Sequence, residues 1–227
     1  MVKVHNPMTP LGLGLYTPKQ AAFLARVTTQ TVTRWVHGTD RGQPAIRAQL
    51  DGDDQRRITF LDFVQIMAIR SIRRERKVPL AKIREFVLRA ENEYGLTHPF
   101  AREHTTYLFE DDIVLSHNNK LIQITGKYKH QDLIKPVVEL YMEDLTFQND
   151  LAVSYKPLRD GERFVLVDPH KRMGQPLVMP CGYSVHAILE SLRAEGTPQA
   201  AAEVNDISIQ DVRLAQRYED ILAGIAA

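Results

Sequence analysis

The first half of the chain alternates apolar and polar residues with helical spacing. Thr17 is followed three residues later by Gln20, with Pro18 at the first helical position, which is typical of a helix that begins with a capping box. Thr28 is a second N-cap candidate, and Gly38 is placed to end the helix that it opens. The pattern therefore predicts two short helices joined by a tight turn, as in a helix-turn-helix unit.

The second of these helices has an apolar and a polar face. Val32, Trp35 and Val36 recur at helical spacing and are expected to pack inward. Gln, Thr and Arg on the other face are residue types that contact bases or phosphates in the DNA major groove, although a face of this kind can also simply be solvated. The residues that we predict to bind DNA from this helix are Thr29, Gln30, Thr33, Arg34 and His37.

The segment after these helices predicts a basic β-hairpin. Residues 45–50 and 56–60 have the composition of strands, and Asp51-Gly52 between them is a favoured turn. Such a wing would contact phosphates and fix the register of the protein on DNA without reading its sequence. The predicted phosphate contacts are Arg47, Arg56 and Arg57.

Two longer helices are predicted next. Thr59 and Asp62 form a capping pattern at the start of the first, and Pro79 opens the second, which ends near Gly95. The end of the first helix is basic, and it is either a solvated helix terminus or a further phosphate-binding site. Its basic residues are Arg70, Arg73, Arg74, Arg76 and Lys77.

The segment from Tyr16 to about Glu93 resembles the winged helix-turn-helix of the MerR and excisionase families. The resemblance is carried by YTPKQAAFLARVTTQTVTRWV and by RRITFLDFVQIMAIRSIRRERKVPLAKIREFV, where a basic strand leads into two helices. It covers about a third of the chain and implies a DNA-binding domain. One departure is Thr33-Arg34 before Trp35, where the family often has an Arg-aromatic pair.

A change of composition near residue 98 marks a predicted domain boundary. Beyond it, residues 107–125 predict short strands with a turn at residues 117–120. A helix is predicted from about residue 132 to residue 143, and two strands are predicted around Asp160-Gly161. We therefore expect a small mixed α/β region between the two ends of the chain.

The last part of the chain predicts a compact unit of three helices. Ser184 caps the first helix, Thr197-Pro198 opens the second, and Ser208 with Asp211 caps the third. The order is again that of a helix-turn-helix, so a second DNA-binding unit is one interpretation.

The net charge of +1 conceals opposite charges in the two halves. Residues 1–100 hold 16 Lys and Arg against 9 Asp and Glu, a net charge of +7, whereas residues 101–227 hold 13 against 19, a net charge of −6. Residues 160–227 alone hold 6 against 10, a net charge of −4. Because an acidic surface repels DNA, we expect the C-terminal unit to contact protein instead.

The segment VLVDPHKRMGQPLVMPCGYSVHAILESLRAEGTPQAAAEVNDISIQDVRLAQRYE resembles a small helical domain of VapB-type antitoxins. A departure is Met179-Pro180-Cys181-Gly182, where relatives often have a Gly-x-Arg approach to the first helix. The two resemblances together cover about 60% of the chain, and their order is that of two-domain antitoxins encoded beside a PIN-like ribonuclease toxin. The matching positions are Asp168, Pro169, Gly174, Pro176, Val178, Gly196, Thr197, Ala202, Glu203, Ile207, Ser208 and Val212.

The resemblances imply an α+β protein of three parts. Residues 1–98 would be a winged helix-turn-helix that binds double-stranded operator DNA, residues 99–167 a connecting region, and residues 168–227 a helical domain that binds a toxin or a second copy. We expect a homodimeric antitoxin that neutralises a PIN-like toxin and represses its own operon. The alternative is a MerR-like regulator that responds to a small ligand and has no toxin partner.

The sequence offers no sign of catalysis. It contains no Gly-rich phosphate loop, nucleophile elbow or His-x-x-x-His pair, so we predict no catalytic residue, metal or cofactor. Cys181 is the single cysteine and cannot form an internal disulfide. With no apolar run of about 18 residues and no secretory signal, a cytoplasmic location is expected.

Overall fold

The computed structural model describes residues 13–39, 42–50, 55–103, 106–109, 112–117, 120–123, 135–136 and 144–226. Within these residues the fold is a mixture of helices and antiparallel strands, as the sequence predicts. The helices are α1 (Pro18–Ala25), α2 (Thr29–Val36), α3 (Phe60–Glu75), α4 (Leu80–Tyr94), α5 (Val185–Glu195), α6 (Pro198–Val204) and α7 (Ile209–Ala226). The strands are β1 (Leu15–Tyr16), β2 (Ile58–Thr59), β3 (Thr106–Phe109), β4 (Asp112–His117), β5 (Lys120–Gln123), β6 (Lys135–Pro136), β7 (Leu145–Gln148), β8 (Leu151–Asp160), β9 (Arg163–Val167) and β10 (Leu177–Met179).

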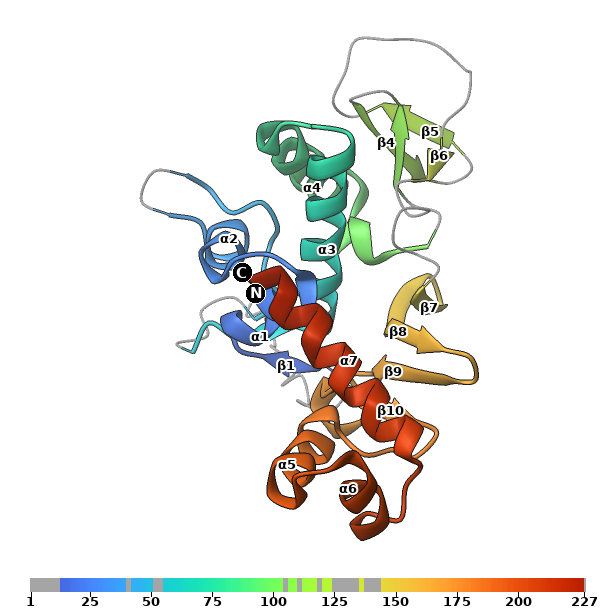
Figure 1. Cartoon of the computed structure of the whole chain (residues 1–227). Helices are drawn as coiled ribbons and strands as arrows, with labels where there is room; N and C mark the ends of the chain where they lie inside the picture. Colours follow the sequence, from blue (N-terminus) through green and yellow to red (C-terminus); the bar gives the residue numbers. More distant parts are fainter. Residues whose placement is uncertain are drawn as a thin grey trace, which may run out of the picture.

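The described elements form an N-terminal group of helices with a two-stranded sheet, two four-stranded sheets and a C-terminal helical module (Figure 1). The described strands pair in the orders β10-β9-β8-β7, β5-β4-β3-β6 and β1-β2. α4 packs against β4, and α7 packs against β9, β10 and α1. The last helix therefore runs from the C-terminal module back to the first helix of the chain, as Figure 1 shows.

A continuous buried core links the two ends of the chain. Phe63 of α3 lies at its centre, with its ring centroid 5.9 Å from that of Tyr16 in β1 and 5.8 Å from that of Tyr155 in β8. Close contact is also made at Gly14, where an added Cβ would lie 3.1 Å from the Cβ of Pro169. The N-terminal helices and the C-terminal module are thus packed together by both apolar and backbone contacts.

The predicted helix starts are confirmed. Thr17 and Gln20 form the capping box of α1, and the Thr28 side chain accepts a hydrogen bond from the backbone N–H of Thr31 at the start of α2. Thr59 and Asp62 form a second capping box on α3. Short-range polar signals are decisive here because the first N–H groups of a helix have no partner within the helix itself.

The predicted wing is wrong in the described residues. Residues 45–50 form no strand, residues 51–54 lie outside the described part, and Ile58–Thr59 pairs with Leu15–Tyr16 instead. The reason is that the backbone groups have other partners. The N–H of Ala45 donates to the carbonyl of Trp35, 2.6 Å away, and the N–H of Gln49 donates to the Asp62 carboxylate at 3.2 Å.

The helix predicted from residue 132 to residue 143 is also wrong where it is described. Lys135–Pro136 is strand β6, which pairs with Tyr107 and Leu108 at the edge of its sheet, and the rest of the prediction lies outside the described residues. An edge strand tolerates Pro because its missing N–H is not needed by a second neighbour. The predicted hairpin around Asp160-Gly161 is confirmed as β8 and β9.

The C-terminal module has the three helices that the sequence predicts. Ser184 caps α5, Gly196 follows it in a left-handed conformation, and Thr197 caps α6. Asp211, counted above with the acidic residues, is only 4% exposed. Its carboxylate accepts hydrogen bonds from Arg163 at 3.0 Å and from the N–H of Ser208 at 3.1 Å, so it stabilises the module and adds little to the acidity of its surface.

None of the described helices combines the length and the apolar character that crossing a membrane requires.

Candidate functional site

The candidate nucleic-acid interface is built on α2. This helix follows α1 after a turn in which Arg26 adopts a left-handed conformation with φ of 56°. Val32, Trp35 and Val36 are buried, as predicted, and anchor the helix against its neighbours. Gly38, with φ of 76°, turns the chain away after the helix, and a Cβ there would lie 2.8 Å from the carbonyl oxygen of Gly42.

The opposite face of α2 is accessible. Thr29, Gln30 and Arg34 are exposed, whereas Thr33 and His37 are half-buried. The structure therefore leaves one cation and two hydrogen-bonding side chains of this face open to solvent. Base contact by these residues remains a prediction.

The segment after α2 is held by side chains of the longer helices. The Nε–H of Arg84 in α4 donates to the carbonyl of Pro44 at 3.2 Å. Arg47 in this segment is exposed, but it lies close enough to Glu91 of α4 to influence its carboxyl group. Burial raises the pKa of Glu91, while His98 and Arg47 nearby oppose that shift.

The other two arginines predicted for the wing lie beside β2. Arg56 is exposed and has a left-handed backbone with φ of 51°, and Arg57 is half-buried and already interacts within the protein. The described residues do not bring these two into a hairpin with Arg47, because residues 45–50 and β2 have different partners. The three arginines remain predicted phosphate contacts, now on two separate segments.

The basic end of α3 is divided by burial. Arg73, Arg74, Arg76 and Lys77 are exposed, as either interpretation of this end requires. Arg70 is half-buried, and burial, followed by the nearby cations Arg26 and Arg74, lowers its pKa. Arg70 therefore differs from the four exposed cations in being half-buried.

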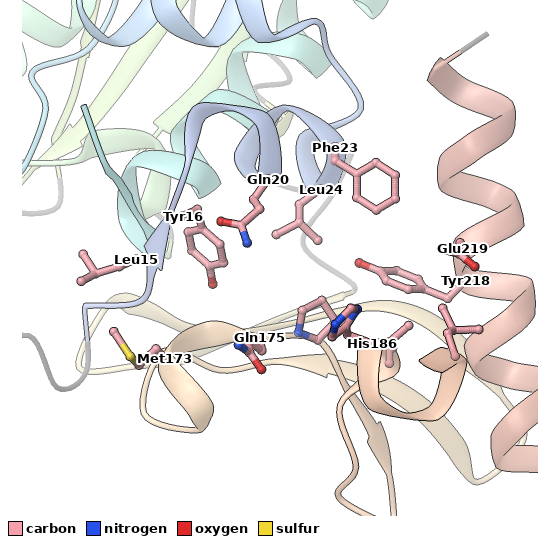
Figure 2. Close-up of a pocket in the computed structure, with 13 residues that line it drawn as sticks. Leu15, Tyr16, Gln20, Phe23, Leu24, Met173, Gln175, His186, Tyr218 and Glu219 are labelled. Atoms are coloured by element: carbon pink, nitrogen blue, oxygen red, sulfur yellow. The ribbon is translucent and has the colours of Figure 1, made fainter. Parts of the chain in front are cut away.

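Sequence reasoning missed a pocket between α1 and the C-terminal module, shown in Figure 2. Its volume is about 320 Å³, and its walls come from β1, α1, α5, α7 and residues 173–176. The sequence pattern of the C-terminal segment includes Gly174, but it does not indicate that this glycine contacts the N-terminal segment. In the structure an added Cβ at Gly174 would lie 2.1 Å from the Tyr16 hydroxyl, so this glycine allows the N-terminal segment to pack at the pocket edge.

Metal binding has no structural basis in the described residues. They contain no group of three or more His, Cys, Asp and Glu side chains that could hold an ion.

The chain is similar in sequence to a named protein and similar in fold to a solved structure. The chain is 25% identical to a protein named "Putative antitoxin VapB45" from Mycobacterium tuberculosis (strain ATCC 25618 / H37Rv), over an alignment of 238 positions, gaps included, that covers 94% of each chain. No family model matches the sequence.

The fold is shared with the crystal structure of Rv2018 from Mycobacterium tuberculosis. The TM-score is 0.60 with 22% sequence identity, over 88% of this chain and 96% of that one. At this identity the likeness concerns the fold. The sequence relative, which aligns over nearly its whole length, suggests an antitoxin.

Proposed function

We propose that the protein is a non-enzymatic antitoxin that binds a toxin protein and represses its own operon. The observation that carries the antitoxin role is the similarity to an antitoxin-named protein across 94% of both chains. It agrees with the resemblance of the C-terminal segment to an antitoxin domain. The expected partner is a PIN-like ribonuclease, and the expected site of action is the cytoplasm.

The proposed repressor role rests on α2. Gln30, Thr33 and Arg34 would lie at base edges in the major groove, with Arg56 and Arg57 on phosphates. Arg47 would make a further phosphate contact. A homodimer would place two such helices on two half-sites and so increase affinity.

The proposed toxin-binding region is the C-terminal module. Glu219 and Asp220 lie on α7, where Glu219 is partly paired with Arg193 at 3.2 Å. An acidic surface could compete with RNA for the basic cleft of a nuclease. The double variant Glu219→Gln with Asp220→Asn should therefore weaken a complex with the toxin, and an unchanged affinity would contradict this role.

The deciding experiment is co-expression with the open reading frame next to the gene. The proposal predicts that the neighbour arrests growth when expressed alone, and that the full-length chain restores growth and co-purifies with it. The full chain is used because α7 of the C-terminal module packs against α1. No arrest and no complex would favour a ligand-responsive regulator, an alternative that the pocket beside α1 supports.

A further inference from the structure

The pocket between α1 and the C-terminal module has the properties of a small-molecule site. Its volume of about 320 Å³ is at the lower end of the range for such sites, which suits a molecule with one or two rings. Leu24, Val185 and Leu189 give it apolar walls, and Phe23 and Met173 also line it while remaining 41% and 52% exposed. A bound apolar group would remove both side chains from water, which is favourable.

A buried polar group lies in the pocket wall. Tyr218 of α7 is 3% exposed, and its hydroxyl has no hydrogen-bond partner among the described residues. Figure 2 shows this hydroxyl directed into the space between Leu24 and His186. Since a buried hydroxyl without a partner is unfavourable, the position indicates a group that a ligand would satisfy.

A second polar group is held in place by the cap of α1. The Gln20 Oε1 accepts hydrogen bonds from the N–H of Thr17 at 2.8 Å and from its hydroxyl at 3.1 Å. The side chain is thereby fixed, and its amide nitrogen faces the pocket in Figure 2. A ligand would meet a pre-oriented group there at little cost in side-chain entropy.

The charge of the lining determines the class of ligand. Glu219 is the one Asp, Glu, Lys or Arg among the described lining residues. One of its oxygens accepts from Arg193, and the carboxylate remains partly exposed, with 43% of the side chain accessible. A carboxylate at the edge of an apolar pocket favours a cationic head group and disfavours an anionic one.

From these features we propose that the pocket binds a small amphipathic amine, with an aromatic or branched apolar body and an ammonium head. The body would lie against Leu24, Leu189 and Phe23, the ammonium beside Glu219, and a polar atom of the ligand at the Tyr218 hydroxyl. This site goes beyond the proposed antitoxin role and does not depend on it. Because α1 forms one wall and α5 and α7 the other, the ligand would contact both parts of the protein.

The test is calorimetric titration of the purified full-length protein with 2-phenylethylamine. Phenylacetate is the matched control, since it has the same ring and an anionic head. We expect saturable binding of the amine at one site per chain, with phenylacetate weaker by about tenfold or more, as a single charge contact at a partly desolvated site would give.

Two variants assign the binding to this pocket. Glu219→Gln should reduce the preference for the amine over phenylacetate, and Tyr218→Phe should weaken amine binding by about fivefold through loss of one hydrogen bond. Both variants should keep the thermal unfolding midpoint of the parent or exceed it, which shows that they are folded.

The proposal is overturned if the parent protein shows no saturable binding of the amine, or if the parent and both variants bind it equally. If the amine does not bind and Phe23→Ala also loses the toxin complex, the pocket is instead a docking site for protein. This last result leaves the antitoxin function standing, so the two proposals fail separately.

Discussion

The hydroxyl of Tyr16 donates a hydrogen bond of 3.1 Å to the carbonyl oxygen of Gly174, across 158 positions of the chain. Tyr16 belongs to β1, directly before the helix pair, and Gly174 belongs to the C-terminal segment that resembles an antitoxin domain. The contact is close, because a Cβ added to Gly174 would collide with the Tyr16 hydroxyl. The backbone of Gly174 is also left-handed, with φ of 84°. This pair of residues is thus one of the contacts that join the two parts that the sequence treats as separate.

Gly174→Ala should destabilise the protein by about 2 to 4 kcal/mol. The change adds both a left-handed backbone penalty and a collision with Tyr16. Gly182→Ala is the matched control, because Gly182 has φ of 77° but nothing within 4 Å of its added Cβ. Urea denaturation of the two variants separates the cost of the left-handed backbone from the cost of the collision. Equal losses of unfolding free energy would show that the collision with Tyr16 is unimportant.

Tyr16→Phe should lower the free energy of unfolding by about 1 kcal/mol, the usual net value of one buried hydrogen bond. Tyr218→Phe removes a hydroxyl that has no partner in the described part of the chain, so no loss is expected there. Both changes remove a hydroxyl from a buried tyrosine, and thermal unfolding of the pair provides the comparison. A larger loss in Tyr218→Phe than in Tyr16→Phe would contradict the assigned partners.

The stability of the protein should fall above about pH 10. Burial raises the pKa of Tyr16, Tyr155 and Tyr218 above the ordinary value near 10. Above that pH the unfolded chain loses these protons while the folded chain keeps them, so the free energy of unfolding decreases as pH rises. Absorbance of tyrosinate near 295 nm should show a group of tyrosines that ionise only on unfolding, and full titration of all 8 tyrosines in the folded protein would contradict this.

Asp62→Ala should be among the more damaging single substitutions, at about 2 to 4 kcal/mol. The carboxylate is fully buried and accepts from the N–H groups of Gln49 and Thr59 at 3.2 and 3.3 Å, with His98 Nε2 3.7 Å away. Its removal leaves the buried N–H of Thr59 and the half-buried N–H of Gln49 without partners. Asp62→Asn retains one acceptor oxygen and should cost less, as measured by chemical denaturation. Equal effects of the two changes would show that the loss comes from charge and not from hydrogen bonding.

Arg34→Ala should weaken binding to the operator by about 1 to 3 kcal/mol and relax its sequence preference, because Arg34 is assigned to a base edge. Arg56→Ala, at an assigned phosphate contact, should weaken binding and reduce the slope of log affinity against log salt by about 1. Arg213→Ala removes an exposed cation of α7 and serves as the control, with no change expected. Fluorescence anisotropy over a range of salt concentrations measures the slope. Unchanged affinity and slope in both Arg34→Ala and Arg56→Ala would contradict the DNA-binding assignment.

Local signals in the sequence predicted the capped helices well, but the wing and the helix at residues 132–143 poorly. Thr17, Thr28 and Thr59 cap helices through bonds that span three residues, so the pattern contains both partners. The partners of residues 44–49 are Trp35, Asp62 and Arg84, which no strand propensity could indicate. A hairpin needs its backbone groups free for pairing, and here tertiary contacts engage them first.

The candidate sites were predictable to different degrees. The exposed face of α2 follows from helical periodicity, because the buried Val32, Trp35 and Val36 define its other side. The pocket was not predictable, because its walls come from segments up to about 200 positions apart, from Leu15 to Glu219. Gly174 was noticed as part of a pattern, but only the folded chain shows that its missing side chain accommodates Tyr16.

The return of α7 onto α1 has a consequence for protein synthesis. The α1 helix leaves the ribosome long before α7, which packs against it and begins only at Ile209. The N-terminal helices therefore cannot complete their packing until α7 has been synthesised, and a chain interrupted before Ile209 would lack the contacts that α7 makes with α1. Premature termination should yield a product prone to proteolysis instead of a free-standing DNA-binding fragment.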